Sequence, residues 1–157
     1  MNWEAIGAVG EIVGASAVVI SIVYLSVQIR QSSRVSKAVA IQSWANAAAL
    51  EKSALFSDPD LAALILNASV NNVDNDLKDK LRVQTYFTQL FNTFELLFFQ
   101  RENGTVDNKF FESKATAYLG MMAAPGIRSF WGETRLTHFD ERFRLYVDQE
   151  LRNQDAA

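Results

Sequence analysis

Apolar residues fill the stretch Ala5–Val27 almost without interruption, and Glu11 is the charged residue within it. A helix of this length reaches roughly 35 Å, slightly more than the hydrocarbon core of a bilayer. A cleaved signal peptide fits less well, because no basic residue precedes the stretch and apolar residues continue past the cleavage-like Ala15–Ala17. Hydrophobicity on all sides, followed at once by polar and basic residues, is typical of a membrane exit. The pattern predicts a transmembrane helix over residues 5–29.

The first helix is expected to continue beyond the membrane. Neither glycine nor proline occurs from Ala15 to Asp58, and the alanine-rich segment 38–50 favours helix. Residues 30–57 are therefore predicted to extend the same helix, although residues 30–37 are polar enough to form a hinge. A second apolar stripe could pack on a soluble domain, and it consists of Ile41, Trp44, Ala48 and Leu55.

The rest of the chain shows apolar positions at helical spacing, and no segment alternates with the period of a strand. Helices are expected from residue 59 to about 70, from 77 to 103, from 107 to 123, from 127 to 133, and after Thr137. Asp58 and Asp76 are suited to N-caps, Gly104 to a helix end, and Pro125-Gly126 to a break. We predict an all-α protein with an external N-terminus (1–4), the membrane helix (5–29), its cytoplasmic extension (30–57), a helical bundle (58–153) and a frayed end (154–157).

Small and polar residues recur within the apolar stretch at alternating steps of three and four. This seam consists of Gly7, Gly10, Gly14, Ala17, Ser21, Tyr24 and Gln28. Such spacing keeps one face toward a partner helix, and small side chains let two backbones approach closely in lipid. The seam predicts self-association. Two alternatives stay open, namely that small residues are simply common in membrane helices or that the seam meets a larger membrane protein.

The charged residues around the stretch indicate its orientation. Arg30, Arg34 and Lys37 follow it closely, which favours the cytoplasm for the C-terminal side and allows contact with anionic lipid. Glu11 is expected to snorkel toward the headgroups or to bond a neighbouring helix, and in an oligomer a ring of these carboxylates could instead attract cations.

Candidate chemistry is sparse. The chain has no cysteine and one histidine, His138, so the usual zinc sites cannot form, and His138 is best explained as a cap or surface residue. Residues 38–157 hold twelve Lys and Arg against sixteen Asp and Glu, a balance that disfavours nucleic acid. Glu95, within an aromatic helix, is expected to form a buried ion pair with Arg128 or Arg135 if it faces inward. We predict no enzyme activity and no cofactor.

Several segments resemble a widespread family of small uncharacterised bacterial proteins. The resemblance lies in Asn2–Gly14, in Tyr24–Gln31, and in Gly126–Trp131 followed by Phe139–Val147. It implies a bacterial origin, one N-terminal membrane helix and a helical cytoplasmic domain, and it transfers no activity and no site residue.

Two functions follow as hypotheses. The first is a self-associating interaction or scaffold module that is anchored in the bacterial inner membrane, with lipid, its own copies or a larger membrane protein as partners. The alternative is a small homo-oligomeric pore with Glu11 near its mouth.

Overall fold

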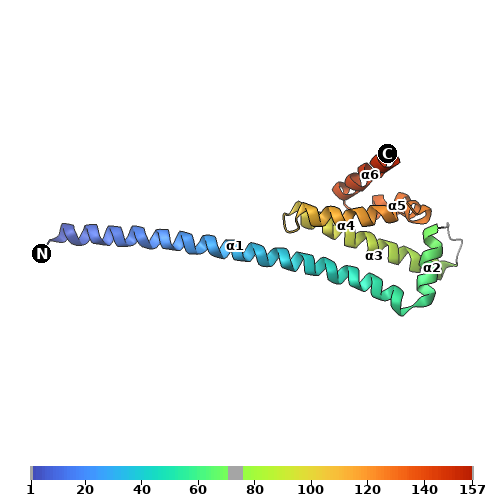
Figure 1. Ribbon diagram of the computed structural model, residues 1–157, viewed down its shortest axis with the longest axis horizontal. Helices are drawn as coiled ribbons and strands as arrows, with labels where there is room; N and C mark the ends of the chain where they lie inside the picture. Colours follow the sequence, from blue (N-terminus) through green and yellow to red (C-terminus); the bar gives the residue numbers. More distant parts are fainter. Residues whose placement is uncertain (1, 71–75, 157) are drawn as a thin grey trace. The chain divides into compact units, whose positions relative to one another are not determined.

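The computed structural model describes residues 2–70 and 76–156, with the side chains of Ala5 and Ile6 left out, and the regular secondary structure within these ranges is all helical (Figure 1). The helices are α1 (Trp3–Ser57), α2 (Pro59–Val70), α3 (Leu77–Glu102), α4 (Asn108–Met121), α5 (Pro125–His138) and α6 (Glu141–Asp155). The predicted all-α class is confirmed. The chain divides into two compact units, Met1–Val39 and Ala40–Ala157, and α1 contributes residues to both.

The first unit consists of the N-terminal part of α1. Within the described residues α1 is the helix that is long and apolar enough to cross a membrane, and none of its most apolar window is buried. Large side chains such as Ile12, Val19 and Ile22 are exposed. Length and composition fit a membrane span and also a signal sequence. The segment proposed as a hinge, residues 30–37, is helical throughout.

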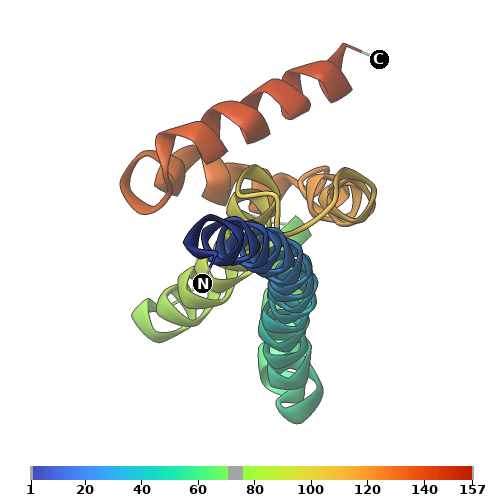
Figure 2. The ribbon, with the colours of Figure 1, turned by 90° about the vertical axis from the view of Figure 1, so that its left-hand side faces the viewer.

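In the second unit, α3 packs against α2, α4 and α5, and α6 lies over α4 and α5 (Figure 2). The core around α3 is aromatic, because the rings of Phe87, Phe91, Phe94 and Phe98 are almost completely buried. Phe94 stacks on Tyr118 of α4 at a centroid distance of 4.7 Å. Stacked and edge-to-face ring contacts of this kind contribute stability in addition to the burial of apolar area, and they connect the helices of the core.

Local sequence signals set the helix ends. The Asp58 and Asp76 carboxylates accept hydrogen bonds of 2.9 Å from the N–H groups of Leu61 and Asp79, as the N-cap prediction requires. Gly104 follows α3 with φ of +69°, in the left-handed region that favours glycine. The predicted polar loop 71–75 lies outside the described residues.

Three boundaries differ from the predictions. α5 begins at Pro125 and reaches His138, so it is longer than the predicted segment 127–133. α6 continues to Asp155, so residues 154 and 155, which were expected to fray, have helical geometry, and the Asp155 carboxylate accepts hydrogen bonds from Arg128. The second unit begins at Ala40 rather than at residue 58, since the stripe Ile41, Trp44, Ala48 and Leu55 packs on the core as expected.

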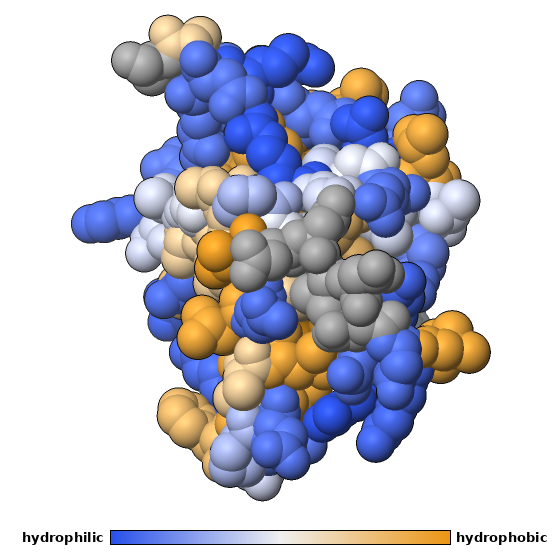
Figure 3. Space-filling view, turned by 90° about the vertical axis from the view of Figure 1, so that its right-hand side faces the viewer, coloured by the Kyte–Doolittle hydropathy of each residue, from blue (hydrophilic) through white to orange (hydrophobic). Residues whose placement is uncertain are grey.

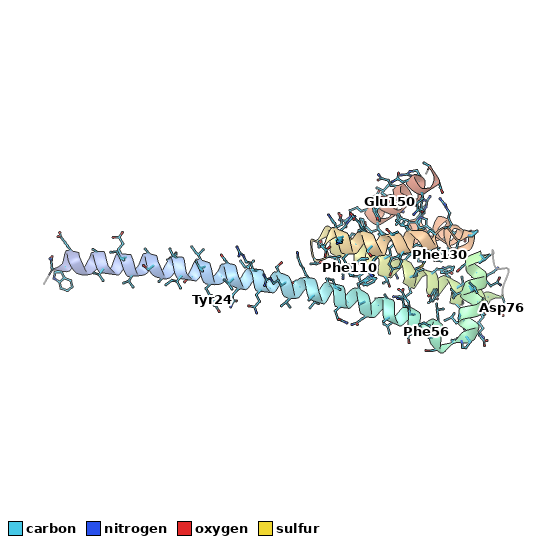
Figure 4. The ribbon with its side chains drawn as sticks, viewed as in Figure 1. Tyr24, Phe56, Asp76, Phe110, Phe130 and Glu150 are labelled. Atoms are coloured by element: carbon cyan, nitrogen blue, oxygen red, sulfur yellow. The ribbon has the colours of Figure 1, made fainter. Side chains whose placement is uncertain are left out.

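Exposed apolar side chains remain on the second unit. Figure 3 shows them among hydrophilic ones on the face viewed from the α2 end. Leu66 and Val70 of α2 and Leu77 and Leu81 of α3 are more than half exposed. Phe56, near the end of α1, is 86% exposed (Figure 4).

Candidate functional site

The predicted seam lies on a helix face that is open along its length. All seven seam residues are exposed. A Cβ atom added to Gly7, Gly10 or Gly14 would meet no atom within 4 Å, so these glycines meet no close neighbour within the chain. Where one face of a helix carries glycine, the backbone of a second helix can approach that face closely.

Polar side chains in the apolar part of α1 form hydrogen bonds within the helix itself. The hydroxyls of Ser16, Ser21 and Ser26 each donate to the carbonyl oxygen four residues earlier, at 2.8 Å. At the end of the seam, the Gln28 side-chain amide donates to the Tyr24 hydroxyl at 2.6 Å (Tyr24 is labelled in Figure 4). Such bonds lower the cost of placing these groups in hydrocarbon, because no external partner is needed.

The charged residues of the first unit are arranged as the sequence implies. Glu11 lies in the apolar part of α1 and is exposed. Arg30, Arg34 and Lys37 are exposed and occupy consecutive turns of the same helix. Long basic side chains placed directly after an apolar stretch can reach anionic headgroups.

The predicted pairing of Glu95 with Arg128 or Arg135 is wrong. Glu95 is half-buried, and its carboxylate accepts a 2.7 Å hydrogen bond from the backbone N–H of Asp140, at the start of α6. Burial raises the pKa of Glu95, while this hydrogen bond acts in the opposite direction. The two arginines are bound elsewhere, because packing of α5 on α6 offers them nearer carboxylates.

These nearer carboxylates belong to α6. Arg128 donates through both terminal nitrogens to Asp155, and both partners are well exposed. Arg135 donates to Asp148 at 2.6 Å, and the indole N–H of the buried Trp131 donates to the other oxygen of the same carboxylate at 2.9 Å. Asp148 therefore accepts the hydrogen bond of an indole N–H that would otherwise be buried without a partner. The Arg135–Asp148 ion pair thus contributes to the packing of α5 on α6.

A second polar cluster, which the sequence reasoning missed, lies inside the bundle. Glu51 of α1 is only 7% exposed and contacts the hydroxyl of Thr93 on α3, which is 1% exposed. Thr93 Oγ1 also lies 3.1 Å from the backbone carbonyl oxygen of Gln89. The Thr93 hydroxyl donates to the Glu51 carboxyl oxygen, and the Gln89 carbonyl is a second acceptor within reach of the same proton.

The surroundings of Glu51 shift its protonation in opposing directions. Burial raises the pKa of its carboxyl, whereas the Thr93 hydrogen bond and the Lys52 ammonium lower it, and burial has the largest effect. Burial also raises the pKa of Tyr86 and of Tyr118, and the Glu51 charge adds to both shifts. The two phenols are therefore neutral at physiological pH.

The Glu51 side chain borders two cavities. One of about 500 Å³ lies among α1, α2, α3, α4 and α5 and is lined mainly by apolar side chains such as Leu55, Phe87 and Leu90. The other, of about 580 Å³, lies among α1, α2 and α3, with the Asp58–Arg82 ion pair of 2.7 Å at its edge. Tyr86 lines both, so Glu51 and Tyr86 stand between them.

One sequence signal could have identified Glu51. The stripe Ile41, Trp44, Ala48 and Leu55 advances by three or four residues, and position 51 completes it. An acidic residue at an apolar position of a helix that packs on a core is a buried polar group, and such groups need a partner. The partner, Thr93, is 42 positions away and could not be read from local pattern.

No protein-family model, no curated protein and no solved structure matches this chain.

Proposed function

We propose that this protein is a membrane-anchored module that associates with copies of itself through α1 and holds its helical bundle at the cytoplasmic face of a bacterial inner membrane. The observation that carries the proposal is the exposed seam, in which glycines open the backbone of α1. Lipid gives no hydrophobic reward for joining two helices, so association depends on close backbone packing, which this face permits.

The hydrogen bonds inside α1 support its placement in lipid. Ser16, Ser21 and Ser26 are bonded to carbonyls of their own helix, so an apolar environment leaves no hydroxyl proton of these residues without an acceptor. The exposed Arg30, Arg34 and Lys37 favour the cytoplasmic side for everything that follows. Trp3 and Tyr24, both exposed, are of the type that gathers at the headgroup level.

A contact module is favoured over a pore on the same evidence. Polar side chains that line an aqueous pore direct their groups to water or ions. Ser16 and Ser21 instead donate their protons to Ile12 and Ala17. A glycine seam also draws helices together, and this leaves little space for a lumen at its centre.

The test is the stoichiometry of the full-length protein and of the variant Gly10→Ile/Gly14→Ile, measured by native mass spectrometry from a mild detergent. We expect a single oligomeric species for the wild type and a lower assembly state for the variant, because two branched side chains would separate the backbones. The matched control is Ala8→Ile/Ala15→Ile, which adds the same side chains on the opposite face of α1 and should leave the stoichiometry unchanged. An unchanged oligomer in the glycine variant would exclude the seam as the contact.

A further inference from the structure

The cavity beside Glu51 has the size and lining of a small-molecule site. At about 500 Å³ it corresponds to roughly 17 liquid water molecules of about 30 Å³ each, so a ligand of about 15 non-hydrogen atoms would fill it. Five helices contribute to its wall, and most of the lining side chains are apolar. A mainly apolar wall with a few polar groups is the usual composition of a ligand pocket.

The polar groups of the cavity fall into two sets. Glu51 accepts a hydrogen bond from Thr93, and Tyr118, 7% exposed, lines the same cavity as a neutral phenol. Lys52 and Lys114 line the cavity with ammonium groups and are more exposed. The positive charge that a ligand meets there therefore lies toward solvent, while the Glu51 carboxyl bonds to the Thr93 hydroxyl.

Lys114 is held in place at this cavity. Its Nζ atom lies 5.4 Å from the ring centroids of both Trp44 and Phe110, which contact each other edge to face (Phe110 is labelled in Figure 4). The buried Trp44 indole N–H has no hydrogen bond of standard geometry, although it is near enough to the Tyr118 hydroxyl to lower the pKa of that phenol. The Lys114 ammonium therefore lies close to two aromatic rings at the cavity, where a charged acceptor group of a ligand can pair with it.

We propose that this cavity binds a small organic monocarboxylate, with its apolar body among α1, α2, α3 and α4 and its carboxylate at Lys114. A cationic ligand is disfavoured, because it would meet the ammonium groups of Lys52 and Lys114. The carboxylate chemistry is common to two sources, an aliphatic acid released from lipid and a soluble aromatic acid. Both would present one acceptor group on an apolar body that the cavity can enclose.

The test uses the full chain in lipid nanodiscs and isothermal titration with three probes that share one apolar body: 2-naphthylacetate, 2-(2-naphthyl)ethanol and 2-(2-naphthyl)ethylammonium. Empty nanodiscs provide the reference titration. We expect the carboxylate to bind at least about tenfold more tightly than the alcohol or the ammonium, because one charge-assisted hydrogen bond to Lys114 contributes a difference in affinity of about this size. Decanoate is the fourth probe. Tighter binding of decanoate than of 2-naphthylacetate would indicate an aliphatic acid released from lipid, and the reverse order of affinities would indicate a soluble aromatic acid. Equal binding of the three naphthyl probes, tighter binding of the ammonium, or no binding of the carboxylates would overturn the proposal.

Variants locate the binding. Lys114→Gln should weaken 2-naphthylacetate about tenfold, while Lys109→Gln, an exposed lysine on the same helix, should change it less than twofold. Ala48→Phe fills the cavity and should abolish binding, and a thermal unfolding trace shows whether that variant is folded. Unchanged affinity in Lys114→Gln, or an equal loss in Lys109→Gln, would contradict the assignment.

Discussion

At the scale of single residues, Glu51 is the most informative side chain of the bundle. A carboxyl that is 7% exposed and has a threonine hydroxyl as its hydrogen-bond partner costs less to bury in its neutral form than in its charged form. It occupies the place of an apolar residue in the stripe that joins α1 to the core. Its proton therefore links the stability of this packing to pH.

The first prediction concerns that link. Burial raises the pKa of Glu51 above 4.5, so the folded protein keeps its proton at pH values where the unfolded chain has lost it. The contribution of Glu51 to stability is thus full below about pH 4.5, falls as pH rises toward the folded pKa, and is constant above it. Each pKa unit between the two states amounts to about 1.4 kcal/mol. Glu51→Gln removes this fall and should be more stable than the wild type at pH 8, with little difference at pH 4.

Unfolding followed by circular dichroism from pH 4 to pH 8, on full-length protein in detergent, measures the effect. Glu112→Gln changes an exposed acid on α4 and serves as the control, with the pH profile of the wild type expected. A Glu51→Gln variant that is less stable by the same amount at every pH would mean that the ionised carboxylate, and not the acid, is the form the fold requires.

At the scale of elements, the contact of α5 with α2 depends on one glycine. Gly126 is buried in the first turn of α5, and a Cβ atom at this position would overlap the backbone carbonyl oxygen of Ala68 on α2. The obstacle is backbone, so it cannot move as a flexible side chain would. The sequence showed Pro125-Gly126 as a break, and the structure adds that the glycine permits close approach of two helices.

The close approach of α2 and α5 leads to a prediction about two glycine substitutions. Gly126→Ala should destabilise the bundle by about 3 kcal/mol, the upper part of the usual range for overpacking, because α2 and α5 must separate. Gly132→Ala, in the same helix, has open space around the added methyl group and should stabilise by about 0.5–1 kcal/mol through helix propensity. Urea unfolding of the two variants compares them, and similar effects from both would show that the close approach does not limit packing.

Features that depend on neighbours in sequence were predictable. The N-caps Asp58 and Asp76 and the helix end at Gly104 follow from a few adjacent residues, and the structure has them as expected. The C-terminal half of α5 was missed because residues 134–138 are largely polar. Its threonines are compatible with helix because hydroxyls such as that of Thr134 donate to a carbonyl of the same helix, at 2.7 Å.

Features that depend on packing were not predictable. Arg135 and Asp148 are 13 positions apart on different helices, and Glu51 and Thr93 are 42 apart. A charged residue in the sequence has many potential partners, and only the arrangement of helices decides among them. For this reason the sequence led to a prediction of arginine partners for Glu95, whereas in the structure Glu95 accepts a hydrogen bond from the backbone N–H of Asp140. Polar clusters and cavities belong to the same class of features.

At the scale of the whole molecule, the proposal requires α1 to be retained and oriented. The chain contains no cysteine, so a single introduced cysteine reports on one position without background. Asn2 lies before the start of α1, and Ala156 follows α6. With Arg30, Arg34 and Lys37 on the cytoplasmic side, Asn2→Cys should react with a membrane-impermeant maleimide in intact bacterial spheroplasts. Ala156→Cys should react only after lysis.

The same preparation separates a membrane span from a signal sequence, the two identities that the length and composition of α1 allow. A retained span leaves the Asn2→Cys label on a chain of about 17.6 kDa in the membrane fraction. Removal of a signal would give a smaller product without that cysteine, and self-association through the glycines of the seam would then be excluded if cleavage follows Ala17, since Gly7, Gly10 and Gly14 would be gone. Labelling of Ala156→Cys in intact spheroplasts would place the bundle outside, against the direction that the three basic residues favour. Retention with the expected orientation would put the Glu51 cavity in the cytoplasm, where its carboxylate ligand would have to be found.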